Sequence, residues 1–101
     1  MKGKERAELR AEAHHLNPMV HIGHQGLSDT ALGALDDALR THELVKVALA
    51  RTLEEAPKAL AAQMAEALGA DIIQTIGRKV TLYRHNPDLW TEPRKLPPWK
   101  G

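Results

Sequence analysis

The stretch MVHIGHQGLSD, residues 19–29, joins a predicted strand to a predicted helix. A short apolar run is followed by two glycines, Gly23 and Gly26, that bracket two polar residues, and Ser28 is a good helix N-cap. A glycine backbone can approach a phosphodiester closely, and the first N–H groups of a helix can bind an anion. The stretch therefore predicts an anion site of the kind with which KH domains clamp a nucleic-acid backbone. The alternative is a tight turn with no ligand.

Hydrophobic periodicity predicts three helices and four strands. Helices are expected over residues 4–16, over residues 30–41, and from the first turn Glu54–Pro57 to a stop at Gly69. Strands are expected over residues 19–22, 44–50, 71–76 and 79–84, with Gly77 and Arg78 forming a two-residue hairpin turn. The order α-β-α-β-α-β-β predicts an α/β fold with a mixed four-stranded sheet and helices on both faces. Strand 44–50 has apolar residues on both faces and should be covered on both sides.

Length and composition limit the class of protein. A chain of 101 residues predicts one domain, and the absence of cysteine excludes disulfide scaffolds, thiol catalysis and cysteine-rich zinc sites. The charged N-terminus does not resemble a signal peptide, and no apolar run approaches the length of a membrane span. These features predict a soluble, cytoplasmic protein without a cofactor.

Charge is segregated along the chain although its formal net value is only +1. Residues 29–71 carry eight acidic and four basic side chains, whereas residues 72–101 carry six basic and two acidic ones. This asymmetry predicts one acidic and one basic face, with a polyanion held near the termini and loops. Chance asymmetry in a small protein is the alternative.

Four motifs in order resemble the CRM domain, named for chloroplast RNA splicing and ribosome maturation, in its stand-alone bacterial YhbY type. They read HHLNP (14–18), HIGHQGL (21–27), ALRTHELVKV (38–47) and GRKVTLYR (77–84). The resemblance implies a fold similar to the C-terminal domain of translation initiation factor 3. It also implies RNA binding without catalysis, with ribosomal RNA of precursor large subunits as the partner of a monomer.

The resemblance runs from about Lys4 to Arg84. We place the domain at residues 1–85 and expect residues 86–101 to form a basic, Pro/Trp-rich extension that lacks regular structure. The residues expected to contact RNA are Gly23, His24, Gln25, Gly26, Lys46, Arg78, Lys79 and Arg84. The family usually has a lysine or arginine after the first loop glycine, whereas this chain has His24. Much of the attraction for phosphate must then come from elsewhere. Surface solubility or a local ion pair is the alternative for Lys46 and Arg84.

Two other functions remain open from the sequence. The first is a protein-interaction module, in which the acidic middle segment and the tail with Trp90 and Trp99 contact a ribosomal protein. The second is a metal enzyme, suggested by four histidines within residues 14–24. Their spacing matches no known zinc arrangement, and no P-loop, nucleophile elbow or paired acid/base motif is present. We therefore expect no catalytic and no metal-binding residues.

Overall fold

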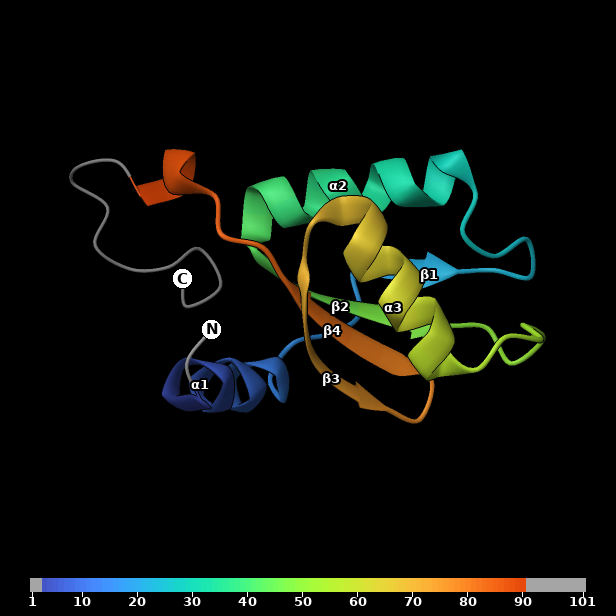
Figure 1. The fold of residues 1–101 in the computed structure, drawn as a ribbon, viewed down its shortest axis with the longest axis horizontal. Coiled ribbons are helices and arrows are strands. Elements are labelled where there is room, and N and C mark those ends of the chain that lie inside the picture. Colours follow the sequence, from blue (N-terminus) through green and yellow to red (C-terminus); the bar gives the residue numbers. More distant parts are fainter. Residues whose placement is uncertain (1–2, 91–101) are drawn as a thin grey trace.

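One mixed sheet with strand order β1-β2-β4-β3 organises the molecule (Figure 1). The computed structural model describes residues 3–90. The elements are α1 (Gly3–Ala13), β1 (Val20–Ile22), α2 (Asp29–His42), β2 (Leu44–Leu49), α3 (Pro57–Leu68), β3 (Asp71–Ile76), β4 (Lys79–Tyr83) and the 3₁₀ helix η1 (Pro87–Trp90). β1 pairs in parallel with β2, and β4 pairs antiparallel with both β2 and β3. The predicted element order and mixed sheet are confirmed.

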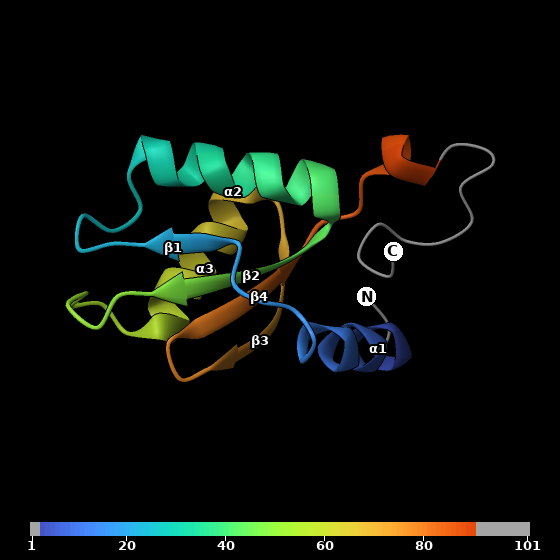
Figure 2. The ribbon, with the colours of Figure 1, turned by 180° about the vertical axis from the view of Figure 1, so that it is seen from behind.

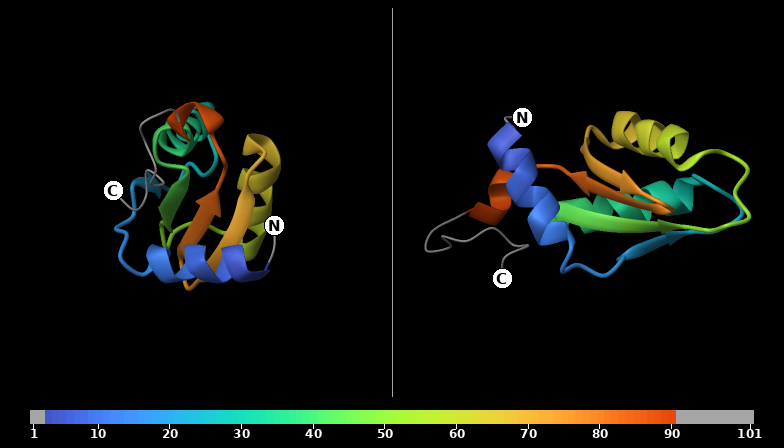
Figure 3. Two further views of the ribbon diagram at one scale, coloured as in Figure 1. Left: turned by 90° about the vertical axis from the view of Figure 1, so that its left-hand side faces the viewer. Right: turned by 90° about the horizontal axis from the view of Figure 1, so that it is seen from below.

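The helices cover the two faces of the sheet unequally (Figures 1 and 2). α2 and α3 pack side by side on one face, whereas α1 lies across one end of the other face (Figure 3). β2 therefore buries Val45 and Val47 beneath α2 and α3, and it buries Leu44 beneath α1. The prediction that this strand is covered on both sides is confirmed at the α1 end.

The main core lies between the sheet and the pair α2 and α3. Its fully buried members include Leu35, Leu39, Leu60 and Met64 from the helices. Their spacing of four residues gives each helix one apolar stripe, and each stripe faces the sheet. A smaller cluster joins Leu9 of α1 to Leu44 and Ile73. Burial in these two clusters removes the apolar faces of all three helices from water.

Two predicted helix boundaries are wrong, each for a local reason. α1 ends at Ala13 rather than at Leu16, because His14, His15 and Leu16 donate backbone bonds three residues back and tighten the last turn. α3 begins at Pro57 rather than at Glu54. Proline holds the preceding residue in an extended conformation, and Ala56 has φ −65° and ψ 145°.

The expectation that the chain is irregular from residue 86 onward is also wrong for residues 87–90, because Pro87–Trp90 forms a 3₁₀ helix, and residues 91–101 lie outside the described part of the chain. Asn86 starts it: its side-chain oxygen accepts the N–H of Asp88, and its side-chain amide donates to the carbonyl of Arg40. The buried carboxylate of Glu43 accepts the Asn86 N–H at 2.7 Å. η1 is thus tied to the C-terminal end of α2.

A β-bulge between Ile72 and Gln74 interrupts the pairing of β3 with β4. Ile72 packs in the main core, whereas Ile73 packs against α1 and Gln74 pairs with Thr81. The bulge therefore turns Ile73 and Gln74 toward the same face, the one that carries α1. Strand periodicity alone does not predict this irregularity.

Among the helices of residues 3–90, none combines the length and apolarity needed to cross a membrane.

Candidate nucleic-acid interface

The loop between β1 and α2 is a tight turn closed by a backbone hydrogen bond. The N–H of Gly26 donates to the carbonyl of Gly23 at 2.9 Å. Gly26 has φ +72°, a conformation that favours glycine, whereas Gly23 does not have a positive φ. A Cβ built on Gly23 would meet nothing within 4 Å. Backbone geometry therefore explains the second glycine of the loop, and the first leaves open space beside the chain.

The start of α2 forms the floor of the loop. Ser28 is extended and its hydroxyl accepts the N–H of Ala31 at 3.1 Å, as the N-cap prediction requires. The N–H groups of Asp29 and Thr30 have no carbonyl four residues back within the helix. They lie at the positive end of the helix dipole, where anions are stabilised.

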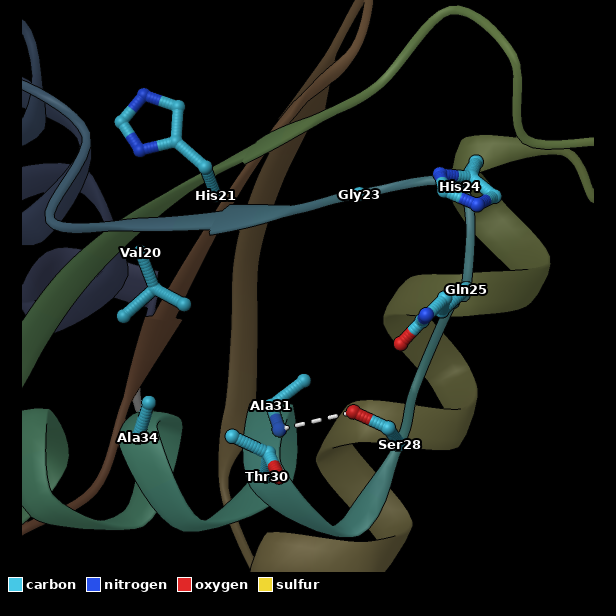
Figure 4. Close-up of a pocket in the computed structure, with 10 residues that line it drawn as sticks. Val20, His21, Gly23, His24, Gln25, Ser28, Thr30, Ala31 and Ala34 are labelled. Atoms are coloured by element: carbon cyan, nitrogen blue, oxygen red, sulfur yellow. Dashed lines mark hydrogen bonds between the residues drawn. The ribbon is translucent and has the colours of Figure 1, made fainter.

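A cleft of about 490 Å³ lies between β1, the loop and the first turns of α2 (Figure 4). Its lining residues are Val20, His21, Gly23, His24, Gln25, Gly26, Ser28, Thr30, Ala31 and Ala34. This set contains no carboxylate, although the exposed Asp29 in the first turn of α2 stands between its members Ser28 and Thr30 in the sequence. It also contains no lysine or arginine, which agrees with the missing loop cation. In Figure 4 Val20 points toward α2, His21 points away from it, and His24 stands at the turn of the loop.

A second cleft of about 350 Å³ separates the loop from the segment between β2 and α3. His24, Gln25 and Gly26 form one wall, and the other is made of Thr52, Leu53, Glu54 and Glu55. The two glutamates disfavour phosphate on this side of the loop. The sequence placed them in a helix, so this acidic wall was missed. An anion can therefore approach the loop more favourably from the side of β1 and α2.

The β3–β4 turn lies at the same end of the molecule as the glycine loop (Figure 1). Two contacts make the link: the Ala50 N–H donates to the Ile22 carbonyl at 2.9 Å, and Arg78 Nη1 donates to the Ala50 carbonyl at 3.1 Å. The Arg78 carbonyl in turn accepts the N–H of Leu49 at 2.8 Å. The structure thereby brings Arg78 beside the end of β2, which is in turn bonded to the end of β1, an arrangement that the sequence could not show.

Lys46 and Lys79 lie on the face of the sheet that carries α1. The two lysines line a cleft of about 290 Å³ together with His14, Gln74, Ile76 and Thr81. The ammonium of Lys46 donates to the carbonyls of Ala13 at 3.1 Å and Leu16 at 3.4 Å. It thus satisfies carbonyls at the end of α1, and a cation there complements the helix dipole. Lys79 is exposed.

Arg84 lies at the opposite end of the molecule from the glycine loop. Its guanidinium donates to the carbonyls of Leu68 at 2.9 Å and Asp36 at 3.2 Å, and it pairs with the Asp36 carboxylate at 2.9 Å. These contacts join the residue after β4 to the middle of α2 and to the end of α3. They favour the ion-pair alternative for this arginine over a contact with RNA.

Comparison with known proteins settles the family. Residues 1–84 match the family model of the CRS1 / YhbY (CRM) domain. The chain belongs to the CRM domain family. It is 31% identical over 88 residues to the "Probable RNA-binding protein YqeI" of Bacillus subtilis, covering 87% of this chain and 92% of the relative. It is 36% identical over 93 residues to an "RNA-binding protein" of Haemophilus influenzae, covering 91% and 94%.

The fold of this CRM domain also matches a solved structure. The solution structure of the hypothetical protein SAV1595 from Staphylococcus aureus superposes with a TM-score of 0.75 at 30% identity, covering 96% of this chain and 99% of that one. The resemblance inferred from the four sequence motifs is therefore confirmed.

The sequence missed His21 as a wall of the loop cleft. Its alternation with Val20 and Ile22 could have placed it on the face opposite the core. Within residues 3–90 no group of three or more histidine, cysteine or acidic residues could hold a metal ion. The side chain of Trp90, and Trp99 with its basic neighbours Arg94, Lys95 and Lys100, lie outside the described residues.

Proposed function

We propose that this CRM domain is a non-catalytic RNA-binding protein that holds a ribosomal RNA backbone at its glycine loop during large-subunit assembly. The observation that carries the proposal is the carboxylate-free cleft at the N-terminus of α2, with Arg78 at the same end of the molecule. The names of the relatives support RNA as the partner. Such a partner implies a cytoplasmic location.

Phosphate binding in this site would be led by the backbone. The N–H groups of Asp29 and Thr30 and the dipole of α2 supply fixed partial charge, and His24 and Gln25 supply hydrogen bonds. Arg78 adds a permanent cation whose planar guanidinium suits phosphate oxygens. Contacts of this kind position RNA strongly but read little sequence. We therefore expect preference for RNA shape with modest sequence selectivity.

Gly23→Asp is the sharpest test of the loop. Gly26→Asp would strain a backbone at φ +72°, but a side chain at Gly23 enters open space, so the fold should persist. The new carboxylate should repel phosphate and weaken binding to large-subunit ribosomal RNA by roughly tenfold or more. The matched control is Gly33→Asp on α2, which adds the same charge at an exposed glycine with open space around it.

Fluorescence anisotropy with the purified protein and that RNA measures both variants. Equal affinity of Gly23→Asp and wild type would remove the loop from the site. Crosslinking in cells tests the assembly part of the proposal: protein–RNA crosslinks should map to ribosomal RNA in precursor large subunits and to peptides of the loop.

The protein-interaction alternative has weaker support from the described residues. Among the acids of α2, Asp36 pairs with Arg84 and Arg40, and Asp37 pairs with Arg40. Their charge is thus largely neutralised within the protein. Failure of the purified chain to bind naked ribosomal RNA would favour a protein partner instead.

A further inference from the structure

The face of the sheet that carries α1 is a second exposed surface, separate from the loop cleft. The register places His21, Ala48, Lys79 and Ile76 in one row across the four strands, and Lys46, Thr81 and Gln74 in the next. Paired residues of neighbouring strands point to the same side of a sheet. These seven residues are called the open face below.

α1 covers only one end of this surface. Its buried apolar contacts are with Leu44 and Ile73, and the view from below in Figure 3 shows it crossing the sheet at one end. Ile76 is 57% exposed, compared with 38% for Met19. No described helix covers His21, Ile76 and Lys79, which are exposed and available to a partner, whereas Thr81 is buried.

The chemistry of the open face suits a polyanion. The cleft of about 290 Å³ on it is lined by His14, Lys46, Gln74, Ile76, Lys79 and Thr81, a set with two ammonium groups and no carboxylate. Ile76 offers an apolar surface to a base, and the Gln74 amide can donate and accept hydrogen bonds. Three strand spacings of about 4.8 Å span about 14 Å, room for two or three unpaired bases.

The open face is continuous with the loop cleft through one residue. His21 lines the loop cleft on one side and a depression with Ala48 and Ala50 on the other. An RNA strand held at Gly23 can therefore reach the open face without passing a carboxylate of either lining set. The open face carries lysines and no carboxylate, which suits the negatively charged backbone of RNA. A protein segment without acidic residues would fit this surface less well.

We propose that RNA held at the glycine loop continues as unpaired nucleotides across the open face, from His21 toward Lys79 and Ile76. This inference rests on the proposed function. It assigns backbone contacts to the loop and base contacts to the sheet, and it makes junctions between paired and unpaired RNA the preferred target.

The test compares an RNA hairpin with the same hairpin extended by about eight unpaired uridines. The extension should raise affinity by roughly tenfold. Ile76→Glu and Lys79→Gln should each remove most of that gain, and each should weaken binding of the extended hairpin much more than binding of the bare hairpin. Lys58→Gln, an exposed lysine of α3 on the other face, is the matched control for charge. Circular dichroism establishes that each variant is folded.

The outcomes separate the two proposals. An equal affinity for both RNAs, or a gain that survives both open-face variants, overturns the inference while hairpin binding upholds the proposed function. Failure to bind either RNA contradicts the proposed function itself. Loss of the gain in Lys79→Gln, which leaves the apolar surface intact, supports the inference even if Ile76→Glu does not fold.

Discussion

Arg78 Nη1 donates a hydrogen bond to the carbonyl of Ala50 at 3.1 Å, and this contact holds the β3–β4 turn against the end of β2. Ala50 in turn bonds to Ile22, the last residue of β1 before the glycine loop. The bond to Ala50 uses one of five guanidinium N–H donors. The others remain for a phosphate at the end of the molecule where the loop lies.

Arg78→Gln should weaken RNA binding and reduce its dependence on salt. Each phosphate neutralised by a cation contributes about −0.7 to the slope of log affinity against log salt for single strands and about −0.9 for duplexes. Loss of Arg78 should make the slope shallower by about that amount. Arg40→Gln is the control, because Arg40 is exposed at the far end of α2. An unchanged slope would show that Arg78 makes no phosphate contact.

Arg84→Met should destabilise the fold and leave RNA affinity within about twofold of wild type. The half-buried guanidinium satisfies two backbone carbonyls and one carboxylate, so its removal should lower the free energy of unfolding by about 1–3 kcal/mol. The ion pairs of Arg40 are exposed, and Arg40→Met should cost less than about 1 kcal/mol. Urea unfolding measures both. A large loss of RNA affinity in folded Arg84→Met would restore this residue to the interface.

Lys46→Met should loosen α1. The ammonium donates to the carbonyls of Ala13 and Leu16, and methionine keeps the apolar stem but provides no donor. The free energy of unfolding should fall by about 1 kcal/mol, and the variant's amide hydrogen exchange should become faster in α1 by more than in α2 or α3. Lys58→Met, at an exposed position of α3, should change neither quantity. Uniformly faster exchange in all three helices would contradict a specific tie between Lys46 and α1.

The environment of Tyr83 should lower the free energy of unfolding at high pH. Burial, together with the carboxylates of Glu43, Glu5 and Asp71, raises the pKa of the Tyr83 phenol above its ordinary value. The folded state therefore holds the phenolic proton more tightly than the unfolded state, in which it leaves at about pH 10. The stabilisation is complete below about pH 10 and is lost as the pH rises through the folded-state pKa.

Tyr83→Phe removes this titration. The free energy of unfolding of wild type should fall more steeply than that of the variant between about pH 9 and pH 11. Urea unfolding at those pH values provides the measurement. Parallel pH dependence of the two proteins would show that Tyr83 does not titrate differently in the two states.

The sequence predicted the fold well where the signal is local. The spacing of Leu35 and Leu39, or of Leu60 and Met64, is a property of one helix. Ser28 marks a helix start through its side-chain hydroxyl, and Gly69 marks a helix end through its backbone N–H. The errors came where contacts with another residue set the local structure. Pro57 holds the residue before it in an extended conformation, so α3 begins later than predicted. Asn86 and Glu43 stabilise a 3₁₀ helix in a segment predicted to be irregular.

The candidate site divides in the same way. The glycine loop, its N-cap and its lack of a fixed cation follow from residues 19–29 alone, because strand, turn and helix start are consecutive in the chain. Strand pairing decided the rest. It set Arg78 beside the end of β2, bound Lys46 to α1, and paired Arg84 with Asp36 away from the loop. These contacts join residues 28 to 48 positions apart, and only the tertiary structure chooses among the partners that such distances allow.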